Sequence, residues 1–422
     1  MQDNEKKPAL RFKGFTDPWE QRKLDEAFDF TVPNNTLSRA ELNQESGSVR
    51  NVHYGDVLIK YGSVLDAQND ELPFITGRSK DDFKGALLQN GDIIIADTAE
   101  DETTGKVCEI VNIQDKDVVA GLHTMVCRPK NKTAEGYFGY YMNSSSYHHQ
   151  LLPLMQGIKV LSLSKTNVQK TTVKYPKDKA EQQKIADCLR RIDTLITLHQ
   201  RKYEKLVNIK KSMLDKMFPP NGASVPEIRF KGFTDPWEQR KISELAEKTY
   251  GGGTPTTSNE AFWNGNIPWI QSSDIVDGKL IGVEPRKYIT QTGLNSSATQ
   301  LVPKNSIAII TRVGVGKLAY MPFSYSTSQD FLSLSKLNTE PFFTVYACYK
   351  KLQSELNTVQ GTSIKGITKD ELLAKTISMP VYSEQKQIGS FFAQLDTLIT
   401  LHQRKLEKLQ NIKKSCLEKM FV

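Results

Sequence analysis

"EQQKIADCLRRIDTLITLHQRKYEKLVNIKKSMLDKMF" (residues 181–218) and "EQKQIGSFFAQLDTLITLHQRKLEKLQNIKKSCLEKMF" (residues 384–421) decide the fold of this chain. Apolar residues in both stretches recur in steps of three and four, which is the spacing of a coiled-coil seam. Apolar residues beside the seam, such as Leu195 and Leu198, widen the face beyond that of a two-helix zipper. The sequence therefore predicts one long helix at each place.

Each predicted seam also contains two polar positions. They are His199 and Lys210 in the first helix and His402 and Lys413 in the second. Because polar residues in a seam can fix which positions face each other, we expect these four to set the register of the helices.

A second repeat shows that the chain is a tandem duplication. "RFKGFTDPWEQRK" occurs unchanged at residues 11–23 and 229–241. Between the repeats lie two divergent regions that share only weak sequence similarity, such as "TTGK" (residues 103–106) and "GVGK" (residues 314–317). We therefore expect five segments: a first domain at 1–177, a long helix at 178–218, a linker at 219–227, a second domain at 228–380 and a second long helix at 381–422.

The divergent regions read as mixed α/β domains, so the predicted fold class is α+β. Short β-rich runs bounded by turn residues indicate strands at "DVLIKYG", "GDIIIAD", "TMVCRP" and "SIAIITR". The segments "GYFGYYMNS" and "FTVYACYKKLQ" indicate helices.

Charge and composition narrow the possible classes of protein. The net charge is +8, and residues 199–217 and 402–420 each hold six basic against two acidic residues, which accounts for the whole surplus. The composition is that of a soluble globular protein, with 38% hydrophobic and 25% charged residues. No apolar run fits a membrane span or a secretory signal, so we expect a cytoplasmic protein without membrane contact.

The sequence contains no motif that indicates a catalytic or metal site. The five cysteines are scattered and never form a C-x-x-C pair, which argues against a disulfide framework and a zinc site. Walker A, Rossmann and nucleophile-elbow patterns are absent, as is the Asn-Pro-Pro tetrad of adenine methyltransferases. We expect a chain that is not an enzyme by itself.

Identity at outward helix positions predicts a contact that is made twice. Packing between the two helices explains the apolar seam, but not identical outer residues; identity left over from a recent duplication is the alternative. The expected partner contacts include Trp19 and Trp237 of the short repeat, although a core role is favoured for these rings. The other expected partner contacts are Thr194, Thr197, Gln200 and Arg201, and Thr397, Thr400, Gln403 and Arg404.

The second half of the chain resembles a known family. It contains "GGGTPTTSNEAFWNGNIPWIQSSDI" from Gly251, "TRVGVGK" from Thr311 and "TSQDFLSL" from Thr327, and it closes with "EQ…I…LDTLI" ending at Ile399. These strings are similar to those of specificity (S) subunits of Type I restriction-modification systems. The first half departs from them between its repeats, in the region where such subunits differ most.

The resemblance implies a sequence-specific DNA-binding subunit. Two target recognition domains would each read one half of a bipartite duplex site, and the long helices would pair as an antiparallel coiled coil within an internal pseudo-twofold repeat. The helices would set the spacing and dock two methyltransferase (M) subunits, with restriction/motor (R) subunits joining them. Adenine methylation and restriction, with S-adenosylmethionine, ATP and Mg²⁺, would then belong to partners. The alternative is a non-catalytic scaffold that binds one protein partner at two equivalent sites.

The resemblance also directs the choice of DNA-contact candidates. Lys and Arg fix register on phosphates, whereas Gln, Ser, Thr and His can read base edges. In the first domain the candidates are Lys60, Tyr61, Thr76, Thr98, Lys106, His123 and Thr124. In the second domain they are Thr254, Ser272, Ser273, Arg312, Lys317, Ser328 and Gln329.

Overall fold

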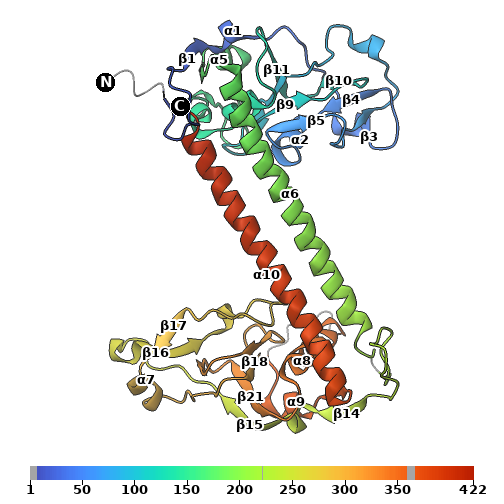
Figure 1. Ribbon diagram of the computed structural model, residues 1–422, viewed down its shortest axis with the longest axis vertical. Helices are drawn as coiled ribbons and strands as arrows, with labels where there is room; N and C mark the ends of the chain where they lie inside the picture. Colours follow the sequence, from blue (N-terminus) through green and yellow to red (C-terminus); the bar gives the residue numbers. More distant parts are fainter. Residues whose placement is uncertain (1–6, 221, 359–365) are drawn as a thin grey trace. The chain divides into compact units, whose positions relative to one another are not determined.

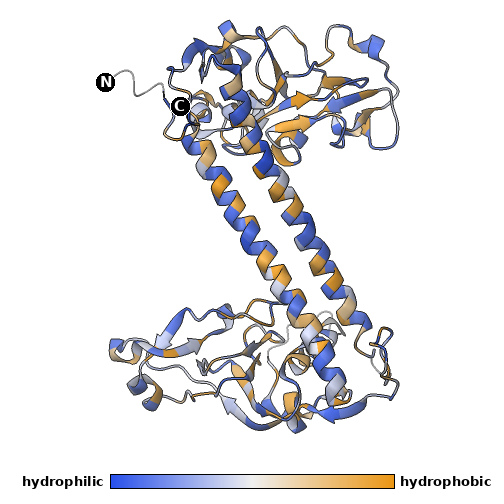
Figure 2. Ribbon diagram, in the orientation of Figure 1, coloured by the Kyte–Doolittle hydropathy of each residue, from blue (hydrophilic) through white to orange (hydrophobic). Residues whose placement is uncertain are grey.

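The computed structural model describes residues 7–220, 222–358 and 366–422 and divides the chain into two compact units (Figure 1). Unit 1 comprises Met1–Leu198 and Leu406–Val422, and unit 2 comprises His199–Lys405. The two long helices, α6 (Lys179–Lys216) and α10 (Tyr382–Lys419), have 38 residues each and contribute to both units. Both predicted helices are confirmed, and apolar and polar residues alternate along them (Figure 2).

Unit 1 holds the following elements besides the long helices. The strands are β1 (Glu20–Lys23), β2 (Phe28–Asp29), β3 (Leu42–Asn43), β4 (Val49–Val52), β5 (Val64–Asp66), β6 (Phe74–Ile75), β7 (Ile93–Ala96), β8 (Thr98–Ala99), β9 (Val107–Val111), β10 (Asp117–Ala120), β11 (Thr124–Pro129), β12 (Leu161–Ser162) and β13 (Thr172–Tyr175). The helices are α1 (Leu24–Ala27), η2 (Arg39–Glu41), α2 (Tyr54–Ile59), η3 (Lys80–Phe83), α3 (Tyr137–Met142), α4 (Ser145–His148), η4 (Leu152–Leu154) and α5 (Lys165–Gln169).

The main sheet of unit 1 is buried on both faces. Over its described residues the strand order is β2-β11-β7-β9-β5, and a second sheet has the order β10-β4-β6-β3. Along β7, Ile93 and Ile95 join a core that contains α3 and the start of α6, whereas Ile94 and Ala96 join the core under α2. This alternation is the period of two that a strand imposes, so one short strand anchors two cores.

Unit 2 is built in the same way. Its strands are β14 (Glu238–Lys241), β15 (Ala246–Gly251), β16 (Trp263–Ile270), β17 (Lys287–Ile289), β18 (Ser306–Ile310), β19 (Leu318–Met321), β20 (Ser326–Thr327), β21 (Phe331–Leu337) and β22 (Thr376–Met379). Its helices are η5 (Ile242–Glu244), η6 (Glu260–Phe262), η7 (Ser272–Asp274), α7 (Gln291–Asn295), α8 (Pro341–Thr358) and α9 (Lys369–Ala374). In the described ranges, one sheet has the strand order β15-β21-β18-β19 and another has the order β17-β16-β20. Strand β18 contributes to two cores: Ile307 and Ile309 pack on the side of α8, and Ala308 and Ile310 pack on the side of β16.

One predicted strand is wrong. The first four residues of "DVLIKYG" belong to the helix α2, because His53 caps its first turn: the ring Nδ1 accepts a hydrogen bond from the Gly55 N–H at 3.1 Å. Val57 and Tyr61, four residues apart, are then buried, whereas Ile59 is 86% exposed. The other predicted strands and both short helices are confirmed as β7, β11, β18, α3 and α8.

A buried clamp joins each copy of the repeated motif to the first turns of a long helix. In unit 1, Arg11 donates two hydrogen bonds to Glu181, at 2.7 and 2.9 Å. In unit 2, Arg229 donates two to Glu384, at 2.7 and 2.8 Å. The last four residues of each motif form a strand, β1 or β14, which also pairs with the strand that precedes the helix, β13 or β22.

The repeated tryptophans lie in the core and contact the chain's own residues. Trp19 is 2% exposed and meets Phe421 edge to face, with ring centroids 6.5 Å apart. Trp237 is 3% exposed and meets Phe218 at 5.9 Å. Because neither ring reaches an outer face, we place both in the core, as the sequence favoured, and leave them out of the partner surface proposed below.

The long helices run antiparallel within each unit, and a Lys–Asp–Tyr group attaches the domain to the pair. In unit 2, Asp396 of α10 accepts from Lys210 Nζ of α6 at 2.5 Å and from the Tyr346 hydroxyl at 2.6 Å. In unit 1, Asp193 of α6 lies 2.6 Å from Lys413 Nζ and accepts from the Tyr140 hydroxyl at 2.8 Å. The predicted seam lysines thus contact the opposite helix in both units.

The seam histidines of unit 2 contact each other. Nδ1 of His199 and Nδ1 of His402 are 2.8 Å apart, so one ring donates and the other accepts. Burial, together with His199 and the cations of Lys202 and Lys405, lowers the pKa of His402. Protonation of both rings would remove the acceptor and place two cations in contact.

This pair predicts an acid-sensitive helix contact. A histidine whose pKa is lowered by folding contributes stability above the usual pKa of about 6.5, and this is lost as the pH falls from there toward the lowered value. Between pH 7.5 and 5.5 we expect the melting temperature of the unaltered chain to fall about 2 °C further than that of a His199→Leu/His402→Leu variant. Calorimetry of the two proteins in matched buffers measures this difference, and equal decreases would contradict the expectation.

Candidate nucleic-acid interface

Four of the seven candidates in unit 2 come together around Asp330. The Ser272 and Ser328 hydroxyls donate to Asp330 Oδ2 at 3.1 and 3.2 Å, and the Thr254 hydroxyl donates to Gln329 Oε1 at 2.6 Å. We call Thr254, Ser272, Gln329 and Asp330 cluster 2. Thr254 and Gln329 are exposed, so their remaining polar atoms are available to a ligand.

The glycine-rich motif before Thr254 lets cluster 2 form. A Cβ on Gly252 would lie 1.8 Å from the backbone oxygen of Ser328, so only glycine allows the two segments to approach this closely. The Gly253 N–H donates to the Thr327 oxygen at 2.8 Å, and the Trp269 indole donates to the Gly253 oxygen at 3.0 Å. The sequence GGGTP is thus held against the segment that carries Gln329.

Basic residues flank this cluster. The Thr311 hydroxyl and N–H both donate to the Asp330 backbone oxygen, at 3.0 and 2.7 Å, and the exposed Arg312 follows directly. Lys317 closes the same loop and is half-buried, while Ser273 is exposed beside Ser272. Ser328 is only 4% exposed, so we correct its prediction: its hydroxyl positions Asp330 and does not face outward.

Unit 1 brings two of its seven candidates together. Thr98 Oγ1 lies 3.5 Å from His123 Nδ1, and it donates to Asp97 Oδ1 at 2.8 Å. His123 Nδ1 lies 3.4 Å from Asp97 Oδ1, the ring meets Tyr54 at 5.3 Å, and the side chain is 47% exposed. We call Asp97, Thr98, His123 and Tyr54 cluster 1.

The other unit 1 candidates are corrected or lie apart. Tyr61 and Thr124 are 4% and 2% exposed and donate to the backbone oxygens of Glu71 and Gly121, so neither faces outward. Burial raises the pKa of Tyr61. The amines of Lys60 and Lys106 donate to the Glu71 and Leu58 oxygens, and burial lowers the pKa of Lys106.

Thr76 is exposed but belongs to a different part of the unit. It follows β6 and accepts a hydrogen bond from the Asn43 amide at 3.0 Å, so it contacts the β10-β4-β6-β3 sheet and not cluster 1.

The two clusters occupy equivalent places in their units. The Asp97 oxygen after β7 accepts from the Leu163 N–H at 2.8 Å, and the Thr311 oxygen after β18 accepts from the Ile367 N–H at 2.7 Å. The last residues of β7 and β18 accept backbone bonds from the "TTGK" and "GVGK" loops in the same pattern. The organising residues, Asp97 and Asp330, were not among the DNA-contact candidates, although both stand in the quoted runs "GDIIIAD" and "TSQDFLSL".

The outward helix residues form a repeated mixed surface. Thr194 and Thr397 are exposed and donate to backbone oxygens four residues earlier, at 2.9 and 2.8 Å. Thr197, Arg201, Gln403 and Arg404 are exposed, whereas Gln200 and Thr400 are half-buried. Beside them stand large apolar side chains with almost equal exposure in the two copies: Leu195 43% and Leu398 42%, Leu198 46% and Leu401 44%.

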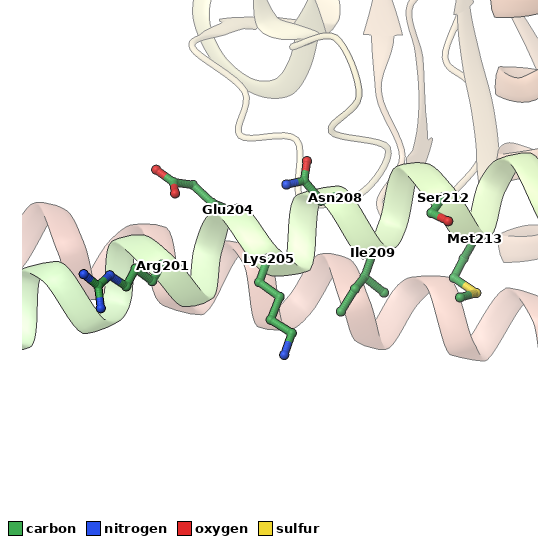
Figure 3. A pocket seen from close by; sticks show the side chains of 7 residues that line it. All are labelled: Arg201, Glu204, Lys205, Asn208, Ile209, Ser212 and Met213. Atoms are coloured by element: carbon green, nitrogen blue, oxygen red, sulfur yellow. The ribbon is translucent and has the colours of Figure 1, made fainter. Parts of the chain in front are cut away.

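On α6 in unit 2 this surface continues as a shallow hollow of about 500 Å³ (Figure 3). Its apolar lining is Ile209 and Met213, with polar groups around them. The polar lining residues are Arg201, Glu204, Lys205, Asn208 and Ser212.

Other kinds of site have no support in the described ranges. No group of three or more His, Cys, Asp and Glu residues there could hold a metal ion. None of the described helices combines the length and the apolar character that crossing a membrane requires.

Comparison with known proteins gives a consistent result. The family model described as "Type I restriction modification DNA specificity domain" matches residues 16–208 and again 234–411. The MjaIX specificity subunit of Methanocaldococcus jannaschii is 27% identical over 193 residues, a match that spans 44% of each chain. The putative MjaX specificity subunit of the same organism is 22% identical over 94% of this chain and 91% of its own length.

A solved structure shows the same fold. The S subunit of the Type I restriction-modification system from M. genitalium superimposes with a TM-score of 0.65 at 14% identity, covering 99% of both chains.

Proposed function

Since this chain belongs to the Type I restriction-modification DNA specificity subunits, which recognise DNA sequence and are non-catalytic, we propose that clusters 1 and 2 each read one half of a bipartite duplex site. The observation that carries this proposal is the equivalent placement of two chemically different polar clusters after β7 and β18. Equivalent placement favours the same task, and different side chains favour different half-site sequences.

The long helices are proposed to set the gap between the half-sites and to dock two methyltransferase subunits. Exposed leucines with nearly equal exposure in the two copies support this, because contiguous apolar surface on a soluble protein marks a contact. Restriction/motor subunits would join this assembly in the cytoplasm. Adenine methylation and restriction, with S-adenosylmethionine, ATP and Mg²⁺, are placed on these partners.

Methylation mapping tests the proposal as a whole. The chain is co-expressed with the methyltransferase encoded beside it, and the host genome is mapped at single-molecule resolution. We expect N6-methyladenine at one split motif of fixed gap. A stable complex that leaves the genome unmethylated would favour the scaffold alternative and overturn the proposal.

Matched variants of the two clusters test which half-site each reads. Gln329→Ala in cluster 2 is expected to weaken discrimination in one half-site by about 1–3 kcal/mol per base pair, because an amide pair to a base edge is lost. His123→Ala in cluster 1 should relax the other half-site only. Binding of the assembled complex to single-mismatch duplexes measures both. Relaxation of the same half-site by both variants would contradict the assignment.

A further inference from the structure

The most exposed large apolar side chain in the described part of the chain stands on a narrow turn of unit 1. Ile158 is 100% exposed, and Val160, two residues later, is 51% exposed. Gly157 adopts φ +123°, and a Cβ there would lie 1.9 Å from the Val160 oxygen, so the turn is as tight as glycine allows. We call residues 157–160 the tip.

Backbone bonds hold the tip beside cluster 1. Gln156 and Ser162 exchange N–H···O bonds of 2.9 and 2.8 Å at the base of the turn. The following strand, β12, pairs with β8, placing Ser162 opposite Thr98. The Leu163 N–H then donates to the Asp97 oxygen at 2.8 Å. Ile158 is therefore presented from the same strand edge as Thr98 and His123.

The surroundings of the tip favour DNA over a protein partner. Its neighbours Gln156, Lys159, Ser162 and Ser164 are exposed and polar, so the exposed apolar surface of the tip is confined to Ile158 and Val160. Protein contacts concentrate on broad, desolvated apolar pockets. A fully exposed Ile on a narrow turn next to a Lys instead matches the side chains that proteins insert between base steps while a cation holds the phosphate.

We propose that Ile158 is an apolar wedge that enters the duplex at the half-site read by cluster 1 and unstacks one base step there. This inference rests on the DNA recognition proposed above. Unstacking beside a target also reduces the cost of extruding a base for methylation, so the tip would act as a positioning element for the partner's chemistry.

The sequence limits the wedge to one half-site. Aligning "QGIKVLSLSK" with "QGTSIKGITK" puts Thr362 in the place of Ile158. Thr362 lies outside the described residues, so the expectation for it comes from the residue type. A threonine carries less apolar surface, and we expect no matching distortion at the second half-site.

Fluorescence of 2-aminopurine tests the wedge in the complex of the full chain with its methyltransferase. The probe is placed in turn at each step of both half-sites, away from the methylated adenine. The unaltered complex should brighten the probe at one step of the half-site read by cluster 1, and Ile158→Ala should abolish this and weaken binding about tenfold or more. Ile158→Leu should retain both.

Lys159→Ala separates the wedge from simple charge contact. It should reduce the salt dependence of binding by about one ion, as expected for a lost phosphate contact, and leave the brightening intact. Unchanged affinity and fluorescence in Ile158→Ala would overturn the wedge, as would a loss of methyltransferase assembly in that variant. An unaltered complex that binds all duplexes equally would overturn the proposed function, and the wedge with it.

Discussion

A chain carrying Leu198→Glu and Leu401→Glu should fold normally and lose methyltransferase binding by at least about 100-fold, which is about 2.8 kcal/mol. Both leucines are close to half exposed, at 46% and 44%, so a carboxylate there stays hydrated in the free chain. Exposed substitutions of this kind change stability by no more than about 0.5 kcal/mol. In an apolar interface, however, the same carboxylate must lose its water without gaining a partner.

The two single variants test whether each leucine contacts its own methyltransferase. Leu198→Glu should leave a complex with one methyltransferase, and so should Leu401→Glu, because each leucine belongs to one copy of the surface. Native mass spectrometry counts the bound copies directly. Val225→Glu, at 46% exposure in the linker, is the matched control and should leave two. A double variant that still binds two copies would remove the leucines from the docking surface.

The second large effect is expected at the buried clamp of unit 2. Arg229→Ala should lower the free energy of unfolding by about 3 kcal/mol or more, since it leaves a buried carboxylate without its cation. The Glu384 side chain is 0% exposed, so water cannot replace the guanidinium without local opening. The nearby Trp237 indole N–H has no hydrogen-bond partner in the described structure.

The same substitution in unit 1 provides the comparison. Arg11→Ala should cost less, because the Trp19 indole N–H still donates to Glu181 Oε1 at 3.3 Å. Arg240→Ala, which removes an exposed ion pair with Glu238, should change stability by less than 1 kcal/mol. Urea unfolding of the three variants ranks them, and a cost for Arg229→Ala as small as that for Arg240→Ala would contradict this account.

The parts of the fold that follow local periodicity could be predicted, and the parts that depend on long-range packing could not. The two long helices could be predicted because a repeated seam over 38 residues is a strong signal. The run "DVLIKYG" is predicted as a strand because a short apolar run does not distinguish a strand from a helix. The cap from His53 favours the helix. No pattern indicated that each long helix would end in a core at the far end of the chain.

The candidate interface shows the same division. Residue type and the resemblance identified Thr98, His123, Thr254, Ser272 and Gln329, which the structure brings into two clusters. Other candidates proved to be buried: the hydroxyl of Thr124, the first residue of β11, donates to the Gly121 oxygen three residues earlier. The roles of Asp97 and Asp330 were equally inaccessible, because carboxylates at strand ends are usually solvated.

The end of α10 has a consequence for how the chain is made. Met420 and Phe421 fill the core of unit 1 against Trp19 and Tyr137, and the Leu10 N–H donates to the Lys419 oxygen at 2.8 Å. These residues leave the ribosome only after all of His199–Lys405, which takes about 10–40 s at ordinary translation rates. Throughout that interval the nascent first domain lacks two residues of its core, the packing partners of Trp19 and Tyr137. A ribosome that stalls before residue 420 therefore leaves the first domain translated without part of its core.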